Sequence, residues 1–312
     1  MKKIKLSNIS TVALLLILVA VMFIALACAS DVFLTTNNLQ NLIRQTAIYG
    51  VIAIGMTFVI MSGGIDLSVG SVVGLSGVIC AMLMSNASWP IFPAAVAAVL
   101  VATLVGVFNG IIIFDGKVPP FIATLGVNTA MRGVIMLITG ARMISGLPKA
   151  FTSFSRDTFL YIPMLGWVWF IIIAVAIVVI KYTTFGRNNF AVGSNTEAAR
   201  LSGINIRLTT YGVYTVCAFL SAIAGVLMTA RLGNGVPTGG EGYETDAIAA
   251  AVLGGASLTG AEGSIIGTVL GSLIMATLRN GGNLLGVNSF VLDIIIGLMI
   301  VFAVMLDKKR KK

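Results

Sequence analysis

Residues 46–84 read TAIYGVIAIGMTFVIMSGGIDLSVGSVVGLSGVICAMLM, with Asp66 as the single charged side chain. Two apolar runs, 46–62 and 67–84, are separated only by Gly63-Gly64-Ile65-Asp66. A full crossing of a lipid bilayer takes about 20 residues of helix, so each run is slightly short. The stretch therefore predicts membrane helices that are interrupted near Asp66 and are either broken or partly re-entrant.

The rest of the chain has the same apolar character. Of its 312 residues, 58% are hydrophobic and 10% are charged, and the mean hydropathy is +1.03. A soluble domain normally carries about 25% charged residues. The 20 basic and 11 acidic side chains cannot cover the surface of a 32.5 kDa globule. Composition therefore excludes an ordinary soluble protein and predicts a polytopic membrane protein.

Apolar runs divided by polar or Gly/Pro-rich segments predict the membrane spans. A second short pair, 246–257 and 263–280, again has Gly-rich sequence between its members. We expect an all-α fold, a polytopic membrane helix bundle of about ten transmembrane segments, some of them short or broken. The ten runs are 11–30, 46–62, 67–84, 91–113, 121–140, 163–181, 209–230, 246–257, 263–280 and 289–306.

Basic residues predict the orientation of the chain. The tails 1–10 and 307–312 are rich in lysine and arginine, and such segments stay in the cytoplasm. Two cytoplasmic tails require an even number of spans in the transmembrane domain, 11–306, and ten satisfies this. Counting inward also places the loop 187–207 in the cytoplasm, and this loop carries three arginines against one acidic residue. One observation opposes this orientation, because the predicted outer loop 141–162 also carries three basic residues.

Side chains for catalysis are scarce. The chain has no histidine, which excludes histidine acid–base catalysis and histidine metal sites. Cys28, Cys80 and Cys217 lie in apolar runs without metal-ligand spacing, and the Gly-rich segment 233–242 lacks the Gly-Lys-Ser/Thr of a phosphate-binding loop. We expect no enzyme activity, no metal and no cofactor. The basic tails adjoin membrane spans, so we expect them to contact membrane lipid and not nucleic acid.

Two segments suggest an internal duplication. Asp66 opens Asp-Leu-Ser-Val-Gly-Ser-Val-Val-Gly, and Asp246 opens Asp-Ala-Ile-Ala-Ala-Ala-Val-Leu-Gly. The tetrapeptides Thr103-Leu-Val-Gly106 and Thr268-Val-Leu-Gly271 follow at unequal offsets, so the repeat contains insertions or deletions. Paired interruptions in two halves of a membrane protein indicate a transport pathway.

The loop 187–207 contains a signal for a short helix. Asn195 or Thr196 can cap it, and Glu197 in the first turn suits the positive end of the helix dipole. Ala198, Ala199 and Leu201 give it an apolar face, and Gly203 ends it. Such a helix is either part of an ordinary ordered loop or a docking surface for a partner.

Sequence motifs extend this interpretation. Glu197-Ala198-Ala199-x-x-x-Gly203 resembles the EAA signature of ABC-importer permeases, in which this loop is the coupling helix that enters a cleft of the ATPase subunit. Further stretches resemble the branched-chain amino acid/ribose permease family, and specifically its monosaccharide branch, over about residues 35–306. They are Ser62-Gly-Gly-Ile-Asp-Leu-Ser-Val-Gly-Ser71, Phe121-Ile-Ala-Thr-Leu125, Gly242-Tyr-Glu-Thr-Asp-Ala-Ile-Ala-Ala-Ala-Val-Leu-Gly-Gly255 and Asn280-Gly-Gly-Asn-Leu-Leu-Gly286.

The resemblance implies an assembly in the bacterial cytoplasmic membrane. Two permease subunits, expected here to be identical copies, would join ABC ATPase subunits and an external solute-binding protein. In this assembly the chain would import a monosaccharide by alternating access, with ribose as the first candidate. The coupling residues would be Glu197, Ala198, Ala199 and Gly203.

Polar side chains at membrane depth are the candidates for the substrate pathway, because burying them is costly. Each also has a structural interpretation: the acids can cap helices, and the asparagines can bridge helices. Arg132 and Arg279 lie near span ends, where their side chains can reach the interface. The candidate pathway residues are Asp66, Asn109, Asn128, Asp246, Asn280 and Asn283.

Three other classes remain open from the residues alone. An ion-coupled secondary sugar transporter fits the broken helices and buried acids, but not the predicted docking loop. A membrane-embedded enzyme lacks a clustered nucleophile. A purely structural membrane partner would not require Asp66 and Asp246 beside helix breaks.

Overall fold

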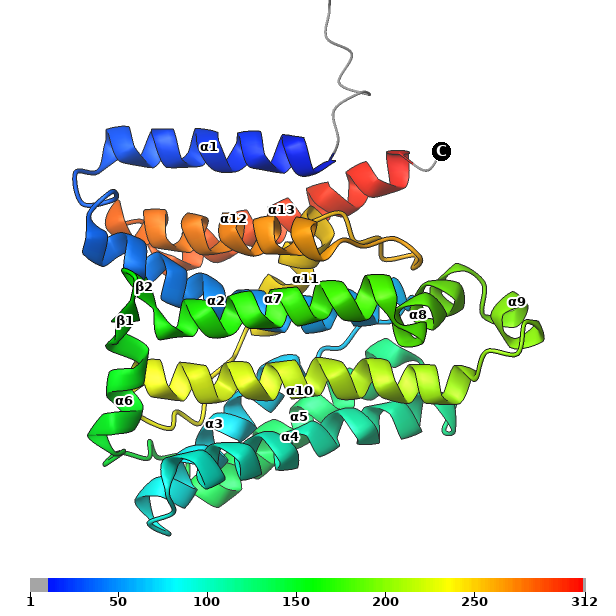
Figure 1. Ribbon diagram of the computed structural model, residues 1–312, viewed down its shortest axis with the longest axis horizontal. Coiled ribbons are helices and arrows are strands. Elements are labelled where there is room, and N and C mark those ends of the chain that lie inside the picture. The colour runs from blue at the N-terminus through cyan, green and yellow to red at the C-terminus, as the bar shows by residue number, and fades with distance from the viewer. Residues whose placement is uncertain (1–10, 311–312) are drawn as a thin grey trace, which may run out of the picture.

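The computed structural model describes residues 11–310, and within them it forms a bundle of long helices that lie side by side (Figure 1). The basic tail segments 1–10 and 311–312 lie outside the described residues. The long helices are α1 (Thr11–Ala29), α2 (Thr36–Met61), α3 (Val69–Ser85), α4 (Ile91–Phe114), α5 (Pro120–Thr139), α7 (Met164–Tyr182), α10 (Ile206–Leu232), α12 (Ile265–Leu284) and α13 (Ser289–Arg310).

Shorter elements connect the long helices. The helices are α6 (Lys149–Arg156), α8 (Thr184–Ser194), α9 (Thr196–Leu201) and α11 (Tyr243–Leu253), and strands β1 (Thr158–Phe159) and β2 (Ile162–Pro163) pair antiparallel. All ten predicted runs contain a helix, which confirms the all-α membrane bundle. The count of ten crossings is approximate, since six of the described helices, α1, α2, α4, α5, α7 and α10, are long and apolar enough to cross a membrane.

One member of each expected short pair is a short helix, namely α3 and α11. The expectation is wrong for the other members, because α2 has 26 residues and α12 has 20. Helix α11 has 11 residues, about 16 Å of helix, whereas a bilayer core is about 30 Å thick. It therefore cannot cross alone. Helix α3 has 17 residues and starts seven residues beyond Ser62, the C-cap of α2. Both short helices begin after a glycine with positive φ, Gly63 at 81° and Gly242 at 81°, a conformation that glycine adopts without strain.

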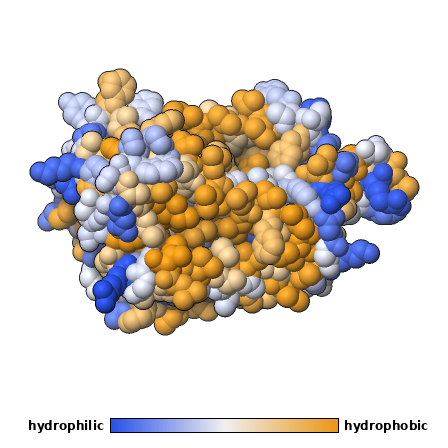
Figure 2. Space-filling view, turned by 90° about the horizontal axis from the view of Figure 1, so that it is seen from below, coloured by the Kyte–Doolittle hydropathy of each residue, from blue (hydrophilic) through white to orange (hydrophobic). Residues whose placement is uncertain are grey.

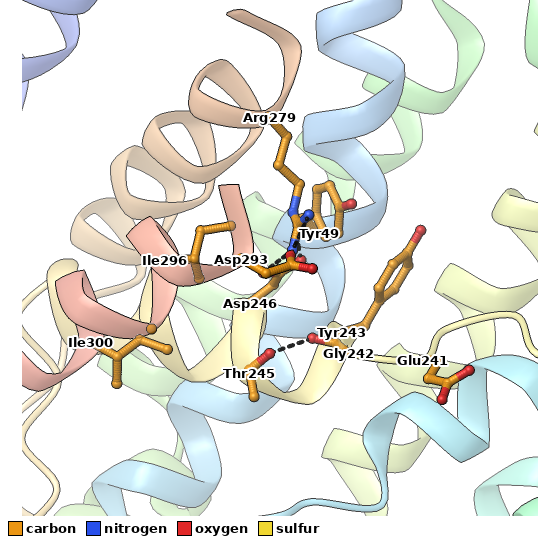
Figure 3. Close-up of a pocket in the computed structure, with 11 residues that line it drawn as sticks. Tyr49, Glu241, Gly242, Tyr243, Thr245, Asp246, Arg279, Asp293, Ile296 and Ile300 are labelled. Atoms are coloured by element: carbon orange, nitrogen blue, oxygen red, sulfur yellow. Dashed lines mark hydrogen bonds and ion pairs between the residues drawn. The ribbon is translucent and has the colours of Figure 1, made fainter. Parts of the chain in front are cut away.

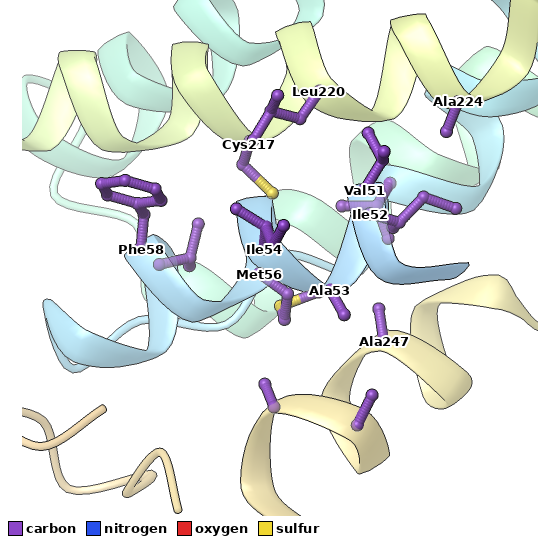
Figure 4. Close-up of a cluster of buried hydrophobic side chains, with 14 of the residues drawn as sticks. Val51, Ile52, Ala53, Ile54, Met56, Phe58, Cys217, Leu220, Ala224 and Ala247 are labelled. Carbon is purple, nitrogen blue, oxygen red and sulfur yellow. The ribbon is translucent and has the colours of Figure 1, made fainter. Parts of the chain in front are cut away.

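Helix α2 forms the centre of the bundle. Every residue from Thr46 to Met61 is buried, because the sequence is apolar on all sides of the helix. Figure 4 shows α2 side chains packed against Cys217 and Leu220 of α10 and Ala247 of α11. Helix α2 also begins ten residues before the predicted run at 46. Thr35 caps α2, and the polar first turns of this helix are continuous with its apolar part.

The packing of the helices supports the predicted duplication. Helix α2 packs on α11 and α12, as α10 packs on α3 and α4. Likewise α3 contacts α4 and α5, as α11 contacts α12 and α13. Helices α2 and α10 run in opposite directions in Figure 1. The two sets α2–α5 and α10–α13 are thus arranged alike, with the broken helices α3 and α11 in matching positions.

The surface divides into an apolar band and two polar ends. Figure 2 shows apolar residues across the middle of the molecule and hydrophilic residues towards both ends, as lipid contact requires. In Figure 1, α8, α9 and the last turn of α13 lie at one end, and α6 with the β1–β2 pair lies at the other. Loop 187–207 and the C-terminal end of α13 therefore share one side of the bundle.

Candidate functional site

A cavity of about 480 Å³ lies between α2, α11, α12 and α13. The Gly-rich break before α11 supplies one wall, and α13 supplies the opposite wall (Figure 3). Its lining combines acidic, basic, aromatic and aliphatic side chains. These residues are Tyr49, Glu241, Gly242, Tyr243, Thr245, Asp246, Arg279, Asp293, Ile296, Gly297 and Ile300.

An ionic cluster stands at the inner part of this cavity. Arg279 donates from Nη2 to Asp246 Oδ1 over 2.9 Å and from Nε to Asp246 Oδ2 over 3.1 Å. Its Nη1 reaches Asp293 Oδ1 at 3.3 Å. Asp246 is almost fully buried, whereas the Asp293 side chain is 59% exposed. Two-point pairing satisfies the buried acid, and the second acid remains open to the cavity.

The remaining lining residues surround this cluster. The rings of Tyr49 and Tyr243 lie 4.8 Å apart, centroid to centroid. Glu241 and Thr245 are exposed, and the Thr245 hydroxyl donates to the Gly242 carbonyl. The cavity therefore offers hydrogen-bonding groups beside aromatic faces, which is a typical composition of a small-molecule site.

Asp66 lies in a different place, deep between α3, α4 and α10. Its Oδ1 accepts from the backbone N–H and the hydroxyl of Ser68, at 2.8 and 2.6 Å. Asn109 Nδ2 donates to Ser68 Oγ over 2.8 Å. The structural interpretation of Asp66 as a helix cap is wrong: Ser68 is the N-cap of α3, and Asp66 stabilises the turn before this helix. Asp66 Oδ2, Asn109 Oδ1 and Tyr214 OH are buried without a hydrogen-bond partner.

The other three asparagines do not join either group. Asn280 and Asn38 exchange two hydrogen bonds, at 2.8 and 3.2 Å, and so bridge α12 and α2. Asn128 lies on α5 with its Oδ1 buried and unpaired, and Asn283 is exposed. The six candidate pathway residues are thus spread over several sites, and each pathway role stays a prediction.

Sequence reasoning missed several lining residues of the cavity. Arg279 was expected to reach an interface, but it pairs with Asp246. An arginine at membrane depth needs a counter-charge, so Arg279 could have been predicted to pair with a buried acid such as Asp246. Tyr49 comes from a distant part of the chain and carries no such signal. Arg132 likewise turns inward, donating from Nη1 to the Gly239 carbonyl over 2.7 Å.

The predicted short helix is present as α9. Asn195 caps it, because its side chain accepts from Ala198 N–H at 2.9 Å. Ala199 is buried, while Glu197 and Arg200 form an exposed ion pair that lowers the pKa of Glu197. At its end Gly203 has φ 82°. Open space surrounds Gly203, so its backbone conformation, and not a lack of room within the chain, accounts for the glycine.

The loop 187–207 is more ordered than expected. Helix α8 fills its first part and packs on α7 and α10. Helix α9 follows it and projects from the end of the bundle (Figure 1). Leu201 at its tip is 75% exposed. Single exposed apolar side chains are common on protein surfaces, so the role of α9 as a docking element stays a prediction.

These features define a multi-pass membrane protein with two short, broken helices and a projecting helix at one end. The chain belongs to the family described as branched-chain amino acid transport system/permease component, which matches residues 38–304.

Characterised relatives match nearly the whole chain. It is 42% identical to the ribose import permease protein RbsC of Bacillus subtilis (strain 168), over 93% of this chain and 90% of the relative. It is 40% identical to RbsC of Escherichia coli (strain K12), over 95% and 92%. It is also 32% identical to the xylose transport system permease protein XylH of Escherichia coli (strain K12), over 98% and 93%. No solved structure matches the chain significantly.

Proposed function

We propose that this chain is the membrane-spanning subunit of an ATP-driven ABC importer for a monosaccharide, with ribose as the first candidate. The similarity to ribose import permeases over nine-tenths of the chain carries this proposal. The xylose permease is a more distant relative, which favours ribose between the two sugars. The chain itself is not an enzyme in this proposal, and ATP is hydrolysed in a partner subunit.

Helix α9 is the proposed contact with the ATPase. Its cap at Asn195 and its end at Gly203 hold a rigid projection, and Ala198 and Ala199 lie on the short helix between them. Glu197 pairs with Arg200 and fixes the first turn. A rigid helix transmits movement of the ATPase to α8 and α10, which connect directly to it.

The proposed assembly contains a second copy of this chain and an external binding protein. In it, both termini and the loop 187–207 lie in the cytoplasm, and the end with α6 and the β1–β2 pair faces outward. An external binding protein would deliver the sugar at this outer end. The location is the bacterial cytoplasmic membrane.

The candidate pathway residues divide into two proposed roles. Asp246 lines the cavity and belongs to the substrate path. Asp66 and Asn109 stabilise the turn before α3, through their contacts with Ser68. Asn280 bridges α12 to α2. These three residues are proposed to set the shape of the path without contacting the sugar. Asn128 and Asn283 remain candidates on α5 and at the end of α12.

Reconstitution in liposomes tests the proposal. With the ATPase, the binding protein and ATP, we expect concentrative ribose uptake that stops when ATP is omitted. The ion-coupled alternative predicts the opposite dependence. Concentrative uptake by this chain alone, driven by an imposed H⁺ or Na⁺ gradient, would refute the ABC assignment.

A further inference from the structure

We propose that the cavity between α2, α11 and α13 is a binding site for the sugar in transit, selective for neutral polyhydroxylated monosaccharides. This inference rests on the proposed function, since it names the place where that substrate contacts the permease. The cavity, the open carboxylates and the tyrosine pair carry it.

The cavity is accessible to water. Glu241 and Thr245 are exposed, and the Asp293 side chain is 59% exposed. Glu241 lies just before α11, Thr245 lies on α11 and Asp293 lies on α13, the last helix of the bundle. A charged side chain facing hydrocarbon is costly, so groups of this kind line water-filled cavities. The cavity is therefore hydrated, as a path for a sugar must be.

The lining offers contacts for both the hydroxyl and the C–H groups of a sugar. Asp293 contacts Arg279 through Oδ1 alone, so its other oxygen can accept a hydrogen bond from a sugar hydroxyl. Asp246 fixes the Arg279 guanidinium through two hydrogen bonds. Tyr49 and Tyr243 both line the cavity, and Tyr243, the less buried of the two, offers ring surface for the C–H face of a sugar. A volume of about 480 Å³ leaves room for a monosaccharide with bound water.

The lining carries more acidic than basic side chains. Glu241, Asp246 and Asp293 outnumber Arg279, so the cavity has an excess of negative charge. Water in the cavity screens this charge in part, but the excess still repels an anion at short range. We therefore expect a phosphorylated sugar to bind much more weakly than a neutral sugar.

Protection of an introduced cysteine tests the site. Thr245→Cys is placed in the cavity, with Cys28, Cys80 and Cys217 changed to alanine. Thr158→Cys is the matched control, an exposed threonine on β1 outside the cavity. Both variants are reconstituted with the ATPase in liposomes without ATP, and the rate of modification by a membrane-impermeant thiol reagent is measured.

We expect ribose to slow modification at 245 and not at 158. At a ribose concentration ten times the dissociation constant, the rate at 245 should fall about tenfold, because only the empty site reacts. Ribose 5-phosphate should give no protection. Adding Asp293→Asn should shift protection to higher ribose concentration, while the exposed Asp157→Asn should leave it unchanged.

Three results would overturn the site: no protection at the highest soluble ribose concentration, equal protection at both positions, or equal protection by ribose 5-phosphate. ATP-driven uptake is measured in parallel with the unsubstituted chain. ATP-driven uptake without ribose protection at position 245 would refute this binding site alone. Absence of ATP-driven uptake would refute the proposed function itself.

Discussion

At the scale of one residue, the complete burial of Asp66 determines which protonation state its carboxyl group favours. The carboxyl group is fully buried, and among the described residues no lysine or arginine pairs with it. Its Oδ2 and Asn109 Oδ1 are both acceptors without a hydrogen. An isolated charge in such a place is strongly disfavoured, so the neutral acid, with a hydrogen to donate, fits this environment.

This interpretation predicts that Asp66→Asn retains sugar uptake, because the amide is neutral, nearly isosteric and able to donate. Asp66→Leu should lose uptake and about 1–3 kcal/mol of stability, since it leaves the Ser68 N–H without its buried acceptor. Uptake and thermal unfolding of the purified variants provide the measurements. Exposed Asp157 serves as control, with both substitutions expected to be tolerated. Loss of uptake in Asp66→Asn with normal stability would mean that the charge is required.

Gly203 is the subject of a second prediction about a single residue. Gly203→Asp should still insert in the membrane but lose uptake, with the ATPase detached or no longer stimulated by loaded binding protein. The added charge would lie on the proposed docking surface, where an unpaired buried charge costs several kcal/mol. Gly203→Asn is the matched control, because asparagine also tolerates positive φ and adds similar volume without charge. Equal loss in both variants would point to side-chain bulk instead of charge.

The sequence identified Asp66 and Asp246 as candidate residues but not the residues that they contact. Asp66 and Asp246 were found because each charge stands beside a glycine break in an apolar run. Their partners were not found, because Ser68 and Asn109 or Arg279 and Tyr49 come together only when helices pack. Nothing in the sequence spacing indicates that Asp246 meets Arg279 across 33 residues.

At the scale of elements, the two broken helices meet each other. A Cβ atom at Gly70 of α3 would overlap Glu244 Oε2 and the Gly240 carbonyl oxygen before α11. Glycine thus permits the start of α3 to contact the start of α11. The acids Glu244 and Asp246 lie in the first turn of α11. Negative charge there interacts favourably with the positive end of the helix dipole.

This contact predicts that Gly70→Ala destabilises the protein by about 1–3 kcal/mol, the usual cost of forcing atoms into a packed interior. Gly126→Ala on α5 is the control, because open space surrounds its Cβ position. Thermal unfolding in detergent compares the two, and a change in Gly70→Ala no larger than in Gly126→Ala would contradict the close approach of α3 and α11.

Element boundaries were predicted to different degrees. The run 163–181 matches α7 closely, because Pro163 and a polar segment delimit it. The start of α2 was missed by ten residues, since its first turns carry Asn38, Gln40 and Asn41, polar residues that fall outside the apolar run. Asn38 instead pairs with Asn280, and this tertiary contact keeps a polar segment helical.

At the scale of the whole molecule, composition alone was enough to predict a helical membrane bundle, because few charges are available for a soluble surface. The matching arrangement of α2–α5 and α10–α13 could only be suggested, since the two halves share short motifs at unequal offsets. Packing reveals the duplication through equivalent helix contacts rather than through sequence identity.

Orientation in the membrane is the last property of the whole molecule. The end with α8 and α9 carries Arg187, Arg200 and Arg207, while the opposite end carries basic residues on and near α6. At that opposite end, Arg44 donates to the carbonyls of Ser155 and Arg156 and so holds α6 in place. The Arg44 charge therefore has a structural role at that end. We predict the orientation from the basic tails together with the arginines around α9.

We therefore expect Ser194→Cys to resist an impermeant thiol reagent added outside intact cells and to react after the membrane is opened. Thr158→Cys should react from outside in intact cells. Both side chains are exposed, so access across the membrane and not burial decides the result. The experiment uses the background in which the three native cysteines are alanine. Labelling of Ser194→Cys from outside, with Thr158→Cys protected, would reverse the orientation, and α9 would then face away from the cytoplasmic ATPase that it is proposed to contact.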